Sequence, residues 1–171
     1  MSNSRPSRIS LIGMPGSGKS TVGVLLAKRI GLAFVDTDIL IQEQEQATLA
    51  EIIARSSPFV LREIEEQVLL DIPITDSVIS TGGSVVYSPA IMERLSAAST
   101  VIYLRAQLET VEYRISLAPD RGIASPGNHT LEDVYNERVP LYEQYSDLVV
   151  DVDHDTPEAI TGQIISQLDA Q

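Results

Sequence analysis

The chain has 171 residues, of which 43% are hydrophobic, and this length and composition predict one globular domain rather than a disordered chain. It carries 24 acidic against 12 basic residues, and a net charge of −12 disfavours nucleic acid and anionic membranes as partners. The absence of cysteine excludes disulfides, a thiol nucleophile and a cysteine-based metal site. No apolar run is long enough to span a membrane and no apolar signal core opens the chain, so we expect a cytoplasmic protein and, by default, a monomer.

Strand and helix patterns alternate along the chain. Apolar, β-prone runs predict five strands, at about residues 8–12, 32–36, 77–81, 100–105 and 147–152. Helical patterns are expected at about 19–30, at 39–70 with a break near 56–58, and at 131–145. Three more helices are expected: one that begins near 89, one that ends near 117 and one that begins near 156. This alternation predicts an α/β fold: one three-layer domain over residues 1–171, with a five-stranded parallel sheet between helices. Ligands of such folds bind at the carboxyl ends of the strands.

The segment GMPGSGKS, residues 13–20, follows the first predicted strand and precedes a predicted helix. It fits the phosphate-binding pattern G-x-x-x-x-G-K-[ST] in full, in the context that this motif requires. Its glycines let backbone N–H groups turn inward around an anion, Lys19 can reach the β- and γ-phosphates, and the Ser20 hydroxyl can bind Mg²⁺. The expected phosphate-binding residues are Gly16, Ser17, Gly18, Lys19, Ser20 and Thr21.

Two carboxylates follow the second predicted strand, in the sequence VDTD. The third strand, VIST, lacks the acidic residue that often assists the metal in such proteins, so Asp36 and Asp38 are the candidates for this work. One could hold a metal-bound water while the other accepts a hydrogen bond from a substrate hydroxyl. The alternative is that Asp38 only caps the next helix or interacts with the dipole at its N-terminus. A guanine-reading N-K-x-D and a transporter L-S-G-G-Q are both missing, which excludes a GTPase switch and a transporter ATPase.

Residues 118–130, APDRGIASPGNHT, are rich in Gly, Pro, Ser and Asn and predict a mobile loop. In a chain with only two lysines and a strong acidic excess, an arginine in such a loop suggests an anionic ligand.

Six short motifs, in order, resemble the shikimate kinase family of P-loop kinases, and the resemblance covers nearly the whole chain. They are GMPGSGKSTVG, FVDTD, LREIE, STGGS, DRGIA and NERVPLYE. The resemblance implies ATP-dependent phosphorylation of a hydroxyl on a small anionic carboxylate, with Mg²⁺ as cofactor, and shikimate as the acceptor that yields shikimate 3-phosphate. It also implies a lid at about residues 117–130.

The resemblance implies a role for each matching residue. The catalytic group comprises Lys19, Asp38 and the lid residue Arg121. The metal is bound by Ser20, with Asp36 behind it. The substrate site comprises Asp38, Arg62, Gly82, Gly83 and Arg138, with the two arginines on the substrate carboxylate. The ATP site adds Arg114, Arg121 and Pro157 to the phosphate-binding loop.

Three departures from the family pattern fall near the implied substrate pocket: Ser84 replaces a third glycine, Leu61 replaces a phenylalanine, and Ser57-Pro58 replaces Gly-Glu. A kinase of the same fold that acts on homoserine or another hydroxy acid is therefore an alternative. A non-catalytic binding module is a third, which the intact loop and aspartates disfavour. Taken alone, Arg62 and Arg138 could also be ordinary solvated helix charges.

Overall fold

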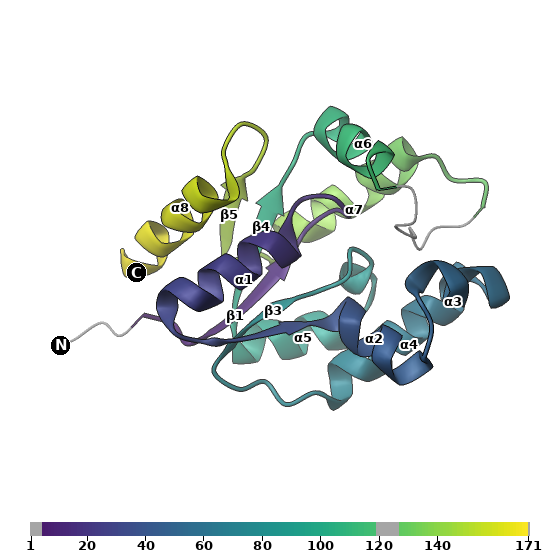
Figure 1. Cartoon of the computed structure of the whole chain (residues 1–171), viewed down its shortest axis with the longest axis horizontal. Helices are drawn as coiled ribbons and strands as arrows, with labels where there is room; N and C mark the ends of the chain where they lie inside the picture. Colours follow the sequence, from purple (N-terminus) through teal and green to yellow (C-terminus); the bar gives the residue numbers. More distant parts are fainter. Residues whose placement is uncertain (1–4, 119–126, 171) are drawn as a thin grey trace.

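The computed structural model describes residues 5–118 and 127–170 (Figure 1). The strands are β1 (Arg8–Ile12), β2 (Ala33–Asp36), β3 (Ser77–Ser80), β4 (Thr100–Arg105) and β5 (Leu148–Asp151). The helices are α1 (Lys19–Ile30), α2 (Thr37–Glu45), α3 (Leu49–Arg55), α4 (Pro58–Asp71), α5 (Pro89–Ala98), α6 (Leu108–Ser116), α7 (Leu131–Tyr145) and α8 (Pro157–Asp169). A single-turn 3-10 helix, η1 (Val85–Tyr87), lies between β3 and α5.

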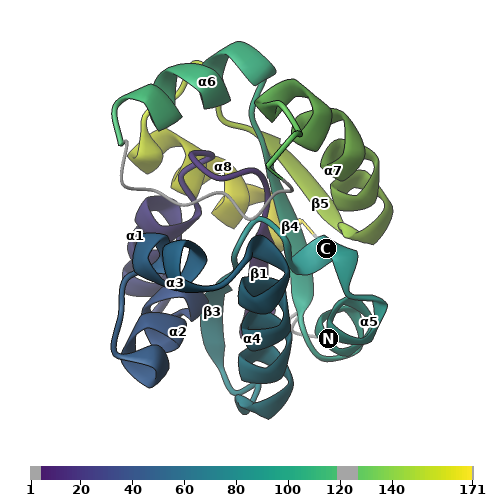
Figure 2. The same ribbon diagram turned by 90° about the vertical axis from the view of Figure 1, so that its right-hand side faces the viewer.

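The five strands form one parallel sheet in the order β2-β3-β1-β4-β5. Helices α1 and α8 cover one face, and α5 and α7 cover the other with α4 beside α5 (Figure 2). The predicted α/β class and the five-stranded parallel sheet are therefore confirmed. Because all strands run the same way, their carboxyl ends meet at one edge of the sheet.

The core explains why β1 and β4 are central. Their side chains at Ile9, Leu11 and 101–104 are fully buried, as expected of strands that are covered on both faces. A smaller apolar cluster joins α2, α3 and α4 around Ile41, Ile52 and Leu61. This second cluster holds the helical subdomain beside the edge of the sheet where the strands end.

The helical region predicted at 39–70 with one break has two breaks. The predicted break is correct, since Ser57 caps α4 and Pro58 occupies its first turn. The second lies at Gln46, which ends α2 in a left-handed conformation with φ 51°. Thr48 then starts α3 in a capping box with Glu51. None of the helices in the described ranges is long and apolar enough to cross a membrane.

Two helical glycines differ in their surroundings, and this difference predicts opposite effects of the same substitution. A Cβ on Gly23 of α1 would lie 2.7 Å from the Phe34 ring and 3.2 Å from Leu11, so α1 can approach the sheet only without a side chain there. A Cβ on Gly162 of α8 would meet only an Arg29 nitrogen at 3.8 Å.

We expect Gly23→Ala to lower the free energy of unfolding by about 1–3 kcal/mol, because of overpacking. Gly162→Ala should raise it by about 0.5–1 kcal/mol, because alanine is the better helix former. Urea unfolding of both variants measures the difference. Equal effects of the two substitutions would contradict the packing of α1 on the sheet.

Candidate active site

The loop between β1 and α1 is closed around the side-chain amine of Lys19. Gly13, Gly16 and Gly18 adopt positive φ values of 148°, 83° and 93°, which favour glycine. Lys19 Nζ donates to the carbonyl oxygens of Gly13 (2.8 Å) and Met14 (2.9 Å), and the residue is only 8% exposed. The hydrogen bonds of Lys19 thus stabilise the curved conformation of the loop, which is the conformation that binds an anion.

Asp36 joins the start of α1 to the start of α2. Its Oδ2 accepts a hydrogen bond of 2.5 Å from the Ser20 hydroxyl, and its Oδ1 accepts from the backbone N–H groups of Asp38 (3.0 Å) and Ile39 (3.4 Å). Asp36 is therefore the cap of α2, and the alternative that Asp38 is the cap is wrong. The Asp38 side chain instead lines the pocket next to Lys19.

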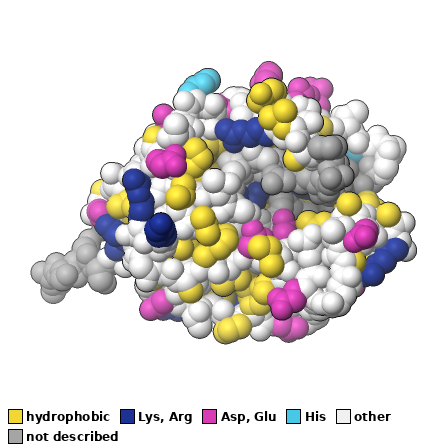
Figure 3. Space-filling view, in the orientation of Figure 1, with side chains coloured by type: hydrophobic (Ala, Val, Ile, Leu, Met, Phe, Trp, Pro, Cys, Tyr) yellow, Lys and Arg dark blue, Asp and Glu magenta, His cyan; other side chains and the backbone are white. Residues whose placement is uncertain are grey.

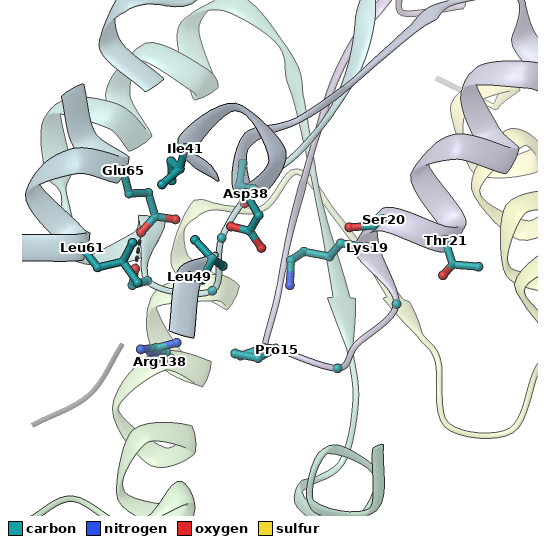
Figure 4. A pocket seen from close by; sticks show the side chains of 16 residues that line it. Pro15, Lys19, Ser20, Thr21, Asp38, Ile41, Leu49, Leu61, Glu65 and Arg138 are labelled. Carbon is teal, nitrogen blue, oxygen red and sulfur yellow. Dashed lines mark hydrogen bonds between the residues drawn. The ribbon is translucent and has the colours of Figure 1, made fainter. Parts of the chain in front are cut away.

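A pocket opens at the edge where the strands end, between the phosphate-binding loop and the α2–α4 subdomain. Basic and acidic side chains both reach the hollow seen there on the molecular surface (Figure 3). Asp38, Lys19, Glu65 and Arg138 surround the same space, although each comes from a different helix (Figure 4). Its lining also includes Pro15, Gly16, Gly18, Ser20, Thr21, Ile41, Leu49, Leu61, Thr81, Gly82, Gly83 and Ser84.

Contacts explain the two glycines after β3. A Cβ on Gly82 would lie 2.0 Å from Glu65 Oε1, and one on Gly83 would lie 2.7 Å from the Pro15 ring and 2.9 Å from Arg138 Nη1. The backbone at this turn can approach the pocket only without side chains. Gly82 lies beside Asp38 and Gly83 beside Arg138, and their role in substrate binding stays a prediction.

Arg62 and Arg138 both contact the aromatic ring of Tyr87. Arg138 is 1% exposed, so the interpretation as a solvated helix charge is wrong for it. Its guanidinium carbon lies 5.2 Å from the centroid of the Tyr87 ring, and that of Arg62 lies 4.1 Å from the same centroid. Tyr87 was not predicted from the sequence. It lies in η1, whose single turn is too short for any periodic pattern to reveal.

A second cavity of about 330 Å³ lies on the other side of the loop. Arg114 of α6 lines it and donates to the carbonyl oxygens of Gly16 (3.1 Å) and Val152 (2.9 Å), and Pro157 lines it at the start of α8. The predicted nucleotide residues Arg114 and Pro157 thus lie beside the loop, with Thr21 between the two cavities. Arg121 lies outside the described residues, so its predicted role and that of the lid stay predictions.

Glu65 is a buried carboxyl at the back of the pocket. Its side chain is only 4% exposed; Oε2 accepts a hydrogen bond from the Ser84 hydroxyl, and Oε1 has no hydrogen-bond partner in residues 5–118 and 127–170. Burial raises the pKa of Glu65 from 4.5 to about 7, and the charge of Asp38 adds to the rise, while the Ser84 hydrogen bond, Arg138 and Lys19 oppose it. The motif LREIE pointed to Glu65, but nothing in the sequence indicated a carboxyl that is half protonated near neutral pH.

The raised pKa of Glu65 predicts a loss of stability at rising pH. The unfolded chain releases this proton near its ordinary pKa of 4.5 and the folded protein only near 7, so the free energy of unfolding falls over that interval. We expect Glu65→Gln to escape this fall, so its stability relative to wild type should rise between pH 5 and 8 by up to about 3 kcal/mol. Urea unfolding across that range measures the difference.

Ser84→Ala is the matched control for this measurement. It removes the hydrogen bond that favours the ionised carboxyl, so it should move the fall to higher pH. A stability difference between Glu65→Gln and wild type that stays constant with pH would contradict the buried, protonated carboxyl.

The family model and the most similar relatives described next are all shikimate kinases. The family model for shikimate kinase matches residues 15–169. Shikimate kinase of Paracidovorax citrulli is 36% identical over 147 residues, which cover 83% of this chain and 80% of that protein. Shikimate kinase of Mycobacterium ulcerans is 36% identical over 162 residues, which cover 93% of this chain and 88% of that protein.

Solved structures extend the likeness to the fold. Shikimate kinase from Acinetobacter baumannii, in complex with shikimate, superposes with a TM-score of 0.88 at 26% identity, over 98% of this chain and 95% of that one. A gluconokinase from Sinorhizobium meliloti superposes with a TM-score of 0.54 at 17% identity, over 96% of this chain and 93% of that one, and shares the fold alone.

Proposed function

The chain belongs to the shikimate kinase family, and from this premise we propose that it transfers the γ-phosphoryl group of ATP to a hydroxyl of shikimate, giving shikimate 3-phosphate and ADP. One observation supports this proposal above the others. Asp38, Lys19 and Arg138 face one pocket beside the phosphate-binding loop, so a hydroxyl-binding carboxylate, a phosphate-binding cation and a carboxylate-binding cation meet in one place.

In this reaction the bond from the γ-phosphorus to the oxygen of ADP breaks, and a bond from the acceptor oxygen to phosphorus forms. The acceptor proton leaves to Asp38, which accepts it from the hydroxyl. Lys19 exchanges the carbonyls of Gly13 and Met14 for phosphate oxygens and offsets the charge that spreads over the transferring group. The protein therefore acts by position and charge, without a covalent intermediate.

The oxygen groups beside the loop suit Mg²⁺. The Ser20 hydroxyl and the Asp36 carboxylate are joined by a hydrogen bond of 2.5 Å, and both offer the hard oxygen atoms that this ion prefers. Within the described ranges no three acidic, histidine or cysteine side chains form a metal cage. That fits an ion held chiefly by phosphates and water, with Ser20 as direct ligand and Asp36 behind it. The ion would supply charge neutralisation on the phosphates.

An acceptor panel tests the function. We expect ADP release with ATP and Mg²⁺ to depend on shikimate, and to stay low with homoserine, with other hydroxy acids and without acceptor. Leu61 and Ser84, two of the departures from the family pattern, line the pocket, so the panel also tests whether they have changed the acceptor. Faster turnover of another acceptor would overturn shikimate as the substrate. Nucleotide binding with no turnover on any acceptor would favour the binding module.

We expect Asp38→Asn to lower kcat by about 10²- to 10⁴-fold, because the amide keeps the shape of the side chain but cannot take the proton. The KM for ATP should change little, since Asp36, which contacts Ser20, is untouched. Steady-state kinetics with each substrate varied gives both constants. If ATP affinity collapses while acceptor binding stays normal, the roles of Asp36 and Asp38 have to be exchanged.

We expect Arg138→Lys to raise the KM for shikimate roughly ten- to a hundredfold, because a point charge cannot make the forked contact of a buried guanidinium with a carboxylate. Arg62→Ala should act in the same direction, and the KM for ATP should stay the same in both. The methyl ester of shikimate is the control substrate. If wild type turns over the ester as well as the acid, the two arginines do not bind a carboxylate.

A further inference from the structure

Tyr87 is the point where the two pocket arginines meet. The guanidinium of Arg62 lies over its ring at 4.1 Å, that of Arg138 lies at 5.2 Å, and Arg138 Nε also donates to the Tyr87 hydroxyl at 3.4 Å. Arg62 belongs to α4 and Arg138 to α7, so the ring contacts side chains from two helices that are far apart in the sequence. Phe59 lies farther from Arg62, at 5.6 Å, and is largely exposed.

Tyr87 is itself held at both ends. Its hydroxyl donates to Glu137 Oε2 at 2.8 Å, and its backbone N–H donates to the Ser84 carbonyl at 3.1 Å within the turn that follows Gly83. The carboxylate of Glu137 makes the phenol oxygen a better acceptor for Arg138, since linked hydrogen bonds strengthen one another. The ring therefore has a defined position relative to the backbone that lines the pocket.

An aromatic ring holds an arginine in a way that suits a binding site. A partner carboxylate would occupy the N–H edge of the guanidinium, which is the edge that a substrate carboxylate needs. A ring attracts the flat face of the guanidinium rather than its N–H edge. Holding a long side chain in place before binding also removes part of the entropy that binding would otherwise cost.

We propose that Tyr87 is a positioning residue for acceptor binding, with its ring orienting Arg62 and its hydroxyl orienting Arg138 towards the carboxylate of the acceptor. The proposal rests on the proposed function for the identity of that acceptor. It assigns this chain a determinant of substrate affinity that lies in η1, outside the motifs that carry the family resemblance.

Two substitutions of Tyr87 separate the contribution of its ring to acceptor binding from that of its hydroxyl. We expect Tyr87→Leu to raise the KM for shikimate by about 3- to 30-fold, with kcat and the KM for ATP nearly unchanged. Tyr87→Phe keeps the ring and should have a smaller effect of the same kind. Tyr113→Leu is the matched control, because Tyr113 is 66% exposed on α6, and it should behave as wild type. With the methyl ester, the difference between Tyr87→Leu and wild type should vanish.

A double-mutant cycle distinguishes positioning from mere structural support. If Tyr87 acts through Arg62, adding Tyr87→Leu to Arg62→Ala should raise the KM much less than it does in wild type. Fully additive effects, or a loss of kcat and of affinity for both substrates alike, would overturn the proposal. Should Tyr87→Leu fail to fold, Tyr87→Phe decides, since it removes the hydroxyl that accepts from Arg138 and keeps the ring; a wild-type KM for shikimate in this variant would overturn the proposal.

The acceptor panel separates failure of this proposal from failure of the proposed function. If wild type prefers another carboxylate, shikimate is wrong, and the same KM comparison with that carboxylate decides on Tyr87. If the preferred acceptor has no carboxylate, both proposals are overturned. If shikimate is the acceptor and Tyr87→Leu matches wild type, only the role of Tyr87 is wrong.

Discussion

Strand β1 lies at the centre of the sheet between β3 and β4, and the turn at its end leads into α1 and positions Lys19 and Ser20. That turn must begin with a residue that has no side chain, because a Cβ on Gly13 would lie only 2.7 Å from the carbonyl oxygen of Leu104 on the neighbouring strand. The loop then returns to start α1 at Lys19, and the Ser20 hydroxyl reaches Asp36 at the end of β2. The hydrogen bond from Ser20 to Asp36 thus joins the phosphate-binding loop to the end of β2, where Asp38 follows.

The pocket balances charge in a protein with a large acidic excess. In the proposed reaction two anions, a nucleotide and a carboxylate acceptor, lie side by side there, and a net charge of −12 would repel both. Lys19 and Arg138 supply local positive charge from within the structure. Burial keeps Glu65 partly protonated near neutral pH, so the back wall of the pocket carries less negative charge than its sequence suggests.

The phosphate-binding loop was predicted from its residues alone, whereas a shared site for Asp38, Gly83 and Arg138 was expected only from the family resemblance. The loop at 13–20 has a spacing whose chemistry is local, and the five apolar runs indicated the parallel sheet. The break after Gln46 has no Gly or Pro to signal it, because a non-glycine residue adopts the left-handed conformation there. The burial of Arg138 against Tyr87 joins residues far apart in sequence, and no periodicity of α7 distinguishes it from a solvated charge.

The turn after β3 also limits how this protein can evolve. Any side chain at Gly82 would displace the Glu65 carboxyl, and any at Gly83 would strike Pro15 and Arg138, so an amino-acid substitution at either position disturbs the pocket. The next residue, Ser84, has room for its hydroxyl against Glu65. The third position of this turn can therefore carry a side chain where the first two cannot, and Ser84 uses that space for its contact with Glu65.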